Sequence, residues 1–137
     1  MTSPSSRLVF DAFALLAFFK DEPAADRVQE ILGGTDALYL SVINLGEVFY
    51  KTVRSHGFDK AQQTLSLIDS YPIEILDVDR QSALSAARLK GMYKMSYADC
   101  FVTALAQRLD ATVVTGDPDF QQLQGQVAIE WLPTAQR

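Results

Sequence analysis

The feature that most constrains the fold is the alternation of short apolar runs with helical stretches along the chain. The strand-like runs cover residues 7–10, 37–41, 73–79, 111–116 and 127–132. Between them, apolar residues repeat at helical spacing over segments long enough to cross back over a sheet. Such crossovers allow parallel pairing, and a parallel sheet needs helices on both faces. The sequence therefore predicts an α/β fold, a three-layer α/β/α sandwich with a central, mostly parallel sheet of four or five strands.

Helices are predicted in the intervening segments, and their ends carry helix-breaking residues. The predicted ranges are 12–19, 23–34, 44–56, 58–71, 80–91, 96–110 and a short helix at 118–123. Gly33 and Gly34 follow the last apolar residue of the second helix, and Gly57 follows the third. Glycine is the usual residue just after a helix, so these positions support the boundaries.

Length and composition predict one soluble domain. The chain has 137 residues, of which 48% are hydrophobic and 21% charged, enough for a substantial core. Residues 1–6 are a polar stretch, expected to be a flexible leader, without the pattern of a secretion signal. The longest apolar run, residues 8–19, contains Asp11 and is too short to span a bilayer. A single cysteine, Cys100, excludes an internal disulfide and fits a reducing cytoplasm.

The charge balance is acidic, with a net charge of −5 and an isoelectric point near 4.7. This argues against binding nucleic acid through bulk positive charge. The objection weakens if several acids hold a divalent cation, because the ion reverses the local sign of the field. Lys51 and Arg54 form a small basic group on one predicted helix. They are candidates for binding RNA, and a solvated helix face is the competing interpretation.

Four acidic residues stand out by position: Asp11, Glu47, Asp99 and Asp117. Each has a plain structural explanation, because each can cap a helix. Asp11 and Asp117 follow strand-like runs directly, and Asp117 precedes a proline suited to the first helical position. Glu47 lies three residues after Asn44 and Asp99 three after Ser96, as in capping boxes.

Taken together, the four acids predict a metal site. The carboxyl ends of parallel strands, and the starts of the following helices, lie along one edge of the sheet. Two carboxylates 4–8 Å apart repel by roughly 2–4 kcal/mol at an effective dielectric near 20, and up to six such pairs rival a domain's stability of about 5–15 kcal/mol. The motifs around the acids contain no lysine or arginine. Oxygen ligands without histidine or cysteine select Mg²⁺ or Mn²⁺.

The segments "LVFDAFALLAFF", "INLGEVFY", "SYADCFVTALA" and "VVTGDPDF", in this order, resemble a PIN domain, most closely the VapC-type ribonuclease toxins of bacterial toxin-antitoxin pairs. The resemblance spans almost the whole chain, so residues 1–137 are expected to form a single PIN-like domain. It implies an Mg²⁺- or Mn²⁺-dependent endoribonuclease in which the four acids ligate one or two ions. A metal-bound water would then cut RNA, leaving a 5′-phosphate and a 3′-hydroxyl.

The same resemblance implies further features of the site and its partners. Thr115 matches a position whose hydroxyl helps to hold the site. Family members commonly form homodimers and are inhibited by a small antitoxin that lies over the active site, and relatives often cleave structured RNA such as transfer RNA. This chain departs from many relatives because Ala12 and Phe13, rather than a serine or threonine, follow Asp11. Asp119, two residues after Asp117, is expected to point elsewhere and to be peripheral.

Other classes of function fit the sequence less well. A phosphotransfer or receiver domain also gathers acids at strand ends, but "FDAF" lacks a second aspartate and no matching lysine follows "TVVTG". The single histidine, His56, excludes a metal-free ribonuclease that uses one histidine as acid and another as base. The remaining alternative is a non-catalytic PIN-like interaction module that binds a cation and a protein partner. The repulsion among the four acids counts against such a module without metal.

Overall fold

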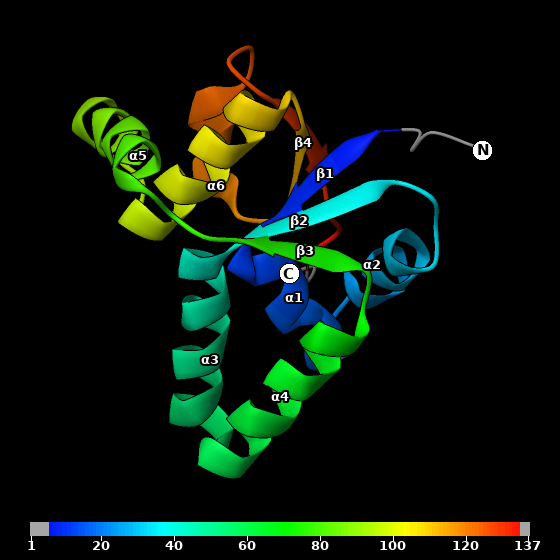
Figure 1. Ribbon diagram of the computed structural model, residues 1–137. Helices are drawn as coiled ribbons and strands as arrows, with labels where there is room; N and C mark the ends of the chain where they lie inside the picture. The colour runs from blue at the N-terminus through cyan, green and yellow to red at the C-terminus, as the bar shows by residue number, and fades with distance from the viewer. Residues whose placement is uncertain (1–5, 135–137) are drawn as a thin grey trace.

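The computed structural model describes residues 6–134 (Figure 1). Most of the predicted leader, residues 1–5, lies outside the described residues. Ser6, its last residue, donates two hydrogen bonds to Asp36 Oδ1, one from its amide and one from its hydroxyl, each 3.0 Å long. No helix within residues 6–134 is long and apolar enough to cross a membrane.

The centre of the molecule is a five-stranded sheet in the order β3-β2-β1-β4-β5. All four strand pairings are parallel, which confirms the predicted fold class. The strands are β1 (Arg7–Phe10), β2 (Ala37–Ser41), β3 (Ile73–Leu76), β4 (Thr112–Thr115) and β5 (Ala128–Trp131).

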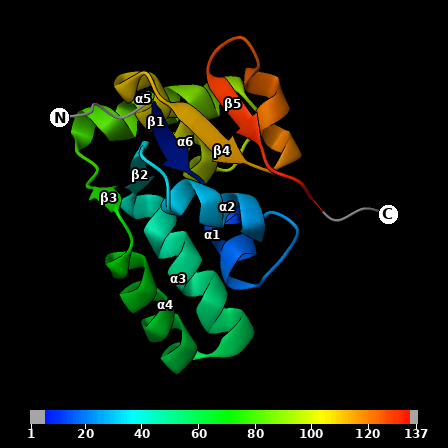
Figure 2. The same ribbon diagram turned by 90° about the vertical axis from the view of Figure 1, so that its right-hand side faces the viewer.

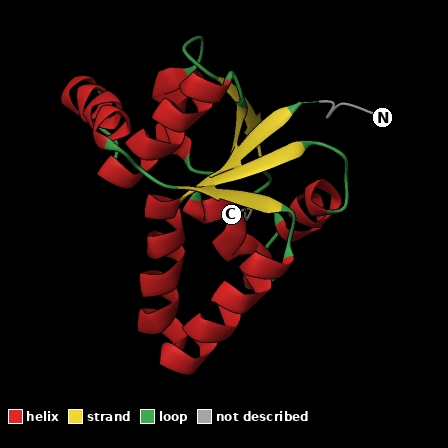
Figure 3. Ribbon diagram, viewed as in Figure 1, coloured by secondary structure: helices red, strands yellow, loops and turns green. Residues whose placement is uncertain are grey.

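Helices cover both faces of the sheet, so the three predicted layers are present (Figure 3). On one face lie α1 (Ala12–Phe19), α2 (Ala25–Leu32), α3 (Val42–His56) and α4 (Phe58–Ser70). On the other lie α5 (Arg80–Met92), α6 (Tyr97–Leu109) and the short 3₁₀ helix η1 (Pro118–Leu123). Leu8 and Phe10 of β1 enter the first core and Val9 enters the second. This alternation is what a strand buried on both faces requires.

The order of the strands reverses at the centre of the sheet. The chain passes from β1 outward to β2 and β3, then returns to place β4 and β5 on the other side of β1 (Figure 2). Val9 pairs with Val113 and Phe10 with Val114, so β1 and β4 end side by side. In open α/β sheets the binding crevice lies at the carboxyl ends of strands where the order reverses.

The start of α3 differs from the prediction by two residues. Ser41, not Asn44, caps the helix, because its Oγ accepts a hydrogen bond from the amide of Ile43 at 3.2 Å. Asn44 is therefore inside the helix and Glu47 lies in its second turn. The predicted capping box between Asn44 and Glu47 is wrong, so Glu47 has no role at the helix end.

Candidate metal centre

A cleft of about 380 Å³ opens at the carboxyl edge of the sheet and receives all four acids that the sequence singles out, Asp11, Glu47, Asp99 and Asp117. Asp119, Glu22, Lys20 and Lys51 also line it. The expectation that the four acids point into one crevice is confirmed. Their chemical roles stay predictions.

Asp11 lies at the end of β1 and is buried, with 1% of its surface exposed. It caps α1, as predicted, because its Oδ1 accepts a hydrogen bond from the amide of Ala14 at 2.9 Å. Burial raises the pKa of Asp11 to about 7, the hydrogen bonds from Thr115 and Ala14 oppose that rise, and the charges of Asp99 and Asp117 add to it. A helix cap alone therefore does not explain why this carboxylate is buried beside two other acids.

Thr115, the last residue of β4, joins the ends of the two central strands. Its Oγ1 donates a hydrogen bond to Asp11 Oδ2. The same oxygen accepts a hydrogen bond from the amide of Asp117 at 3.0 Å. Thr115 is fully buried, so both bonds are shielded from water. The hydroxyl thus fixes the position of Asp11 relative to the β4 end of the cleft.

Asp99, Asp117 and Asp119 each offer a carboxylate oxygen, and these three oxygens lie within 4.8 Å of one another. The expectation that Asp119 points elsewhere is wrong. Asp117 lies before η1 in an extended conformation and caps it, accepting from the Asp119 amide at 2.9 Å. The two residues are therefore not separated by a helical rotation, and both face the cluster.

Asp99 occupies the first turn of α6 and is 7% exposed. Its amide donates to Ser96 Oγ at 3.1 Å, which confirms Ser96 as the predicted cap. The pKa of Asp99 is raised to about 7, mainly by burial and in part by the nearby charges of Asp117 and Glu47. The carboxyl group is therefore close to half protonated at about pH 7, and a positive charge beside it favours the ionised form.

Glu47 reaches the cleft from α3 and has two partners on its own helix. Lys51 Nζ lies 3.0 Å from Glu47 Oε2. Asn44 Nδ2 donates to Glu47 Oε1 at 3.4 Å and to the carbonyl of Ala98 at 3.2 Å, and so connects α3 to α6. Burial works against the charge of Lys51, but the pKa of Lys51 is raised because Glu47 outweighs that effect.

The two basic candidates are placed differently. Lys51 lines the cleft. Arg54 does not line it, and its guanidinium carbon lies 5.1 Å from the centre of the Tyr50 ring. The sequence motifs around the four acids contain no basic residue. Lys51 nevertheless offsets the charge of Glu47 from one turn further along α3.

The ligands available in the cleft suit a hard divalent cation. Among the described residues that line it, the side-chain atoms that could ligate a metal are carboxylate and hydroxyl oxygens, and there is no histidine or cysteine. Such a set favours Mg²⁺ or Mn²⁺ over zinc. Cys100 is buried in α6 and His56 is exposed at the end of α3, where its Nδ1 lies 2.8 Å from Ser55 Oγ. The residues present therefore fit the metal that the sequence predicts.

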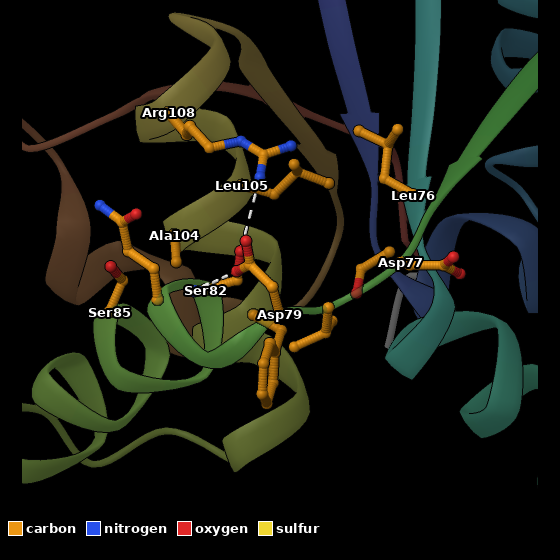
Figure 4. Close-up of a pocket in the computed structure, with 12 residues that line it drawn as sticks. Leu76, Asp77, Asp79, Ser82, Ser85, Ala104, Leu105 and Arg108 are labelled. Carbon is orange, nitrogen blue, oxygen red and sulfur yellow. Dashed lines mark hydrogen bonds between the residues drawn. The ribbon is translucent and has the colours of Figure 1, made fainter.

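A second pocket, of about 150 Å³, lies between the end of β3 and helices α5 and α6. Arg108 extends from α6 toward the start of α5, where its Nη1 donates to Ser82 Oγ at 3.4 Å (Figure 4). The Ser82 amide donates to Asp79 Oδ1 at 2.8 Å, and hydrogen bonds from the backbone and side chain of Ser82 lower the pKa of Asp79. Asp79 is therefore an ordinary helix-capping carboxylate, and none of the four predicted acids lines this pocket.

The PIN domain family model matches residues 8–126, which is most of the chain. The chain belongs to the PIN-domain family. Comparison with curated proteins gave no match.

Solved structures share the PIN fold over nearly the whole chain. A chain of the VapBC2 complex from Rickettsia felis, bound to a promoter DNA fragment, is 19% identical with a TM-score of 0.74, covering 93% of this chain and 99% of that one. VapC20 from Mycobacterium tuberculosis, a Sarcin-Ricin loop cleaving toxin, is 14% identical with a TM-score of 0.74, covering 92% and 99%. A chain of a toxin-antitoxin complex from Klebsiella pneumoniae is 21% identical with a TM-score of 0.69, covering 93% of this chain and 99% of that one. At these identities the likeness is one of fold.

Several residues of this PIN-domain cleft were missed as site residues from the sequence. Phe13 and Lys20 come from α1 and the turn after it, and only the packing of α1 brings them to the cleft. Asn44, interpreted as a cap, does not line the cleft but donates a hydrogen bond to Glu47, which does. Ser41, the last residue of a strand-like run, was the available sign that α3 begins earlier.

Proposed function

We propose that this PIN-domain protein is an Mg²⁺- or Mn²⁺-dependent endoribonuclease and the toxin of a toxin-antitoxin pair. The observation that carries the proposal is the convergence of six carboxylates in one cleft, two of them with pKa values raised to about 7. An unpaired buried carboxylate is costly, and a cation offsets that cost. Asp11, Glu47, Asp99 and Asp117 would hold the ion, and Asp119 lies close enough to share this role.

A bound ion of this kind supplies an activated water and stabilises the negative charge that develops on a phosphodiester. The protein's own residues position the parts. Thr115 holds Asp11 in place and orients the start of η1 through the Asp117 amide. Asn44 holds Glu47 near α6, and Lys51 offsets its charge. Lys51, with Arg54 one turn further along α3, would add local positive charge for the RNA backbone.

The proposed partners follow from the family and the fold. The Rickettsia felis and Klebsiella pneumoniae structures are toxin-antitoxin complexes, which supports a small antitoxin protein as the inhibitor of this chain. The Mycobacterium tuberculosis relative is described as cleaving the Sarcin-Ricin loop, which supports structured RNA as the substrate class. We further propose a single PIN domain over residues 1–137, a homodimer and a cytoplasmic location.

Cleavage of a total cellular RNA pool tests this function. Wild-type protein is incubated with RNA in Mg²⁺, in Mn²⁺ and in chelator, and products are mapped by sequencing of their 5′ ends. We expect cleavage that requires the ion and is lost in Asp99→Asn. Asp79→Asn is the matched control, because Asp79 also caps a helix but lies at the second pocket.

Two outcomes would count against the proposal. Cleavage that persists in chelator would exclude metal dependence. RNA that stays intact with both metals, while the ion still raises the thermal stability of the wild type and not of Asp99→Asn, would leave the non-catalytic cation-binding module as the function.

A further inference from the structure

Phe13 places an aromatic ring in the wall of the acidic cleft. It lies two residues after Asp11, in the first turn of α1, and lines the cleft together with Leu16. Its side chain is partly buried and packs on the core beneath α1 to α4. The ring is therefore anchored on one side and contributes to the cleft on the other.

The position of the ring depends on Gly116. A Cβ atom built on Gly116 would lie 2.4 Å from Cε1 and 2.7 Å from Cζ of Phe13, closer than real atoms approach. The edge of the ring thus fills the space that a side chain at position 116 would need. Gly116 separates Thr115 from Asp117, so the ring lies against the backbone that carries the Thr115 hydroxyl and the Asp117 carboxylate.

The charges of the cleft limit what can lie against this ring. Six acidic side chains and two lysines line the cleft. A phosphate is repelled by the carboxylates except where a cation intervenes. The wall formed by Phe13 and Leu16 is uncharged and suits a flat, uncharged group. In RNA that group is a base, and unpaired bases stack readily on aromatic side chains.

We propose that Phe13 stacks on one unpaired nucleobase next to the phosphodiester that is cut, and so selects single-stranded or looped RNA. This inference rests on the proposed ribonuclease function. It also gives a protein with a net charge of −5 a source of RNA affinity other than positive charge. Stacking contributes to affinity independently of salt, unlike contacts to phosphate.

Equilibrium binding of a fluorescein-labelled single-stranded RNA of about 12 nucleotides tests the contact. All proteins carry Asp99→Asn, so that the strand stays intact in Mg²⁺. We expect Phe13→Leu to raise the dissociation constant by about 5- to 150-fold, and Phe13→Tyr to bind like the Phe13 protein. Phe18→Leu is the matched control, because Phe18 is a partly buried phenylalanine of the same helix that packs on Phe19 and Tyr71.

A set of strands with an abasic residue at each position in turn identifies the stacked base. We expect one position at which the missing base weakens binding to the Phe13 protein by a similar factor and has no effect on Phe13→Leu. This scan of the Phe13 protein needs no substitution at position 13, so it decides the matter even if Phe13→Leu fails to fold. The contact is excluded if no abasic position matters, or if Phe13→Leu binds as tightly as the parent.

Different results would overturn the stacking contact and the proposed ribonuclease function. Wild-type protein that cuts RNA with metal while Phe13→Leu binds normally would overturn the stacking contact alone. An inactive wild type with a Phe13-dependent abasic effect would overturn the ribonuclease function and support the contact.

Discussion

Replacing Asp11 with asparagine removes a buried charge that the metal-free protein holds at a cost. Burial raises the pKa of Asp11 from 3.8 to about 7. At about 1.4 kcal/mol for each pH unit, this corresponds to about 4 kcal/mol. Because the folded state binds the proton more tightly than the unfolded state, stability is lost as pH rises from about 4 to about 7. Above that range the full cost is present.

We therefore expect Asp11→Asn to be more stable than the wild type by about 2–4 kcal/mol at about pH 8 in chelator. The expected gain lies below the full cost of about 4 kcal/mol for two reasons. Asp99 shares the electrostatic repulsion, and an asparagine accepts the Thr115 hydrogen bond less well than a carboxylate does. At about pH 5 the folded carboxyl is still protonated but the unfolded one is largely ionised, so only about a third of the cost is present and the difference should fall to about 1 kcal/mol. Urea unfolding at the two pH values measures both quantities.

In Mn²⁺ the wild type should become the more stable of the two proteins. The ion stabilises the folded wild type by binding to it, and Asp11→Asn offers the ion one carboxylate fewer. Asp79→Asn is the control, since hydrogen bonds to Ser82 lower the pKa of Asp79. It should lose stability at about pH 8 rather than gain it. A gain for Asp11→Asn that is equal at both pH values would refute the electrostatic reasoning.

Three further results are expected. Thr115→Val removes both hydrogen bonds of a buried hydroxyl and should cost about 1–3 kcal/mol in urea unfolding; an unchanged midpoint would contradict it. Gly116→Ala forces the Phe13 ring to move, should cost about 1–3 kcal/mol and should be partly rescued by Phe13→Leu; additive effects would exclude the coupling. Lys51→Gln should weaken RNA binding more than Arg54→Gln, because Lys51 lines the cleft; equal losses in titrations would argue for a diffuse basic face.

The fold could be predicted largely because its signals are local. Apolar runs of strand length, separated by helical spacing and glycine, specify strands and crossovers without knowledge of the tertiary structure. Parallel pairing then places strand ends on one edge, which is why four acids far apart in the chain could be assigned to one crevice. Asp11 follows β1 directly and Asp117 follows β4 after one residue, so an error of one or two residues in a boundary does not move them out of the site.

The details that failed depend on contacts between elements. Asn44 looked like a cap because a capping box and a buried amide have the same local sequence, and only its bond to Ala98 on α6 distinguishes them. Asp119 was expected to point away because it was placed inside a regular helix, whereas Asp117 lies outside η1. Phe13 could not be assigned to the cleft, since its position depends on the missing side chain of Gly116.

The bond between Thr115 and Asp11 also determines when the site can exist during synthesis. It joins residues 104 positions apart, and β4 must insert beside β1 before it forms. When β1, β2 and α3 have been synthesised, the nascent chain contains Asp11 and Glu47 but not yet Asp99 or Asp117. Until α6, β4 and the start of η1 have left the exit tunnel, the carboxylates cannot converge. A nascent chain whose β4 has not yet paired with β1 is therefore unable to bind the cation as a complete site.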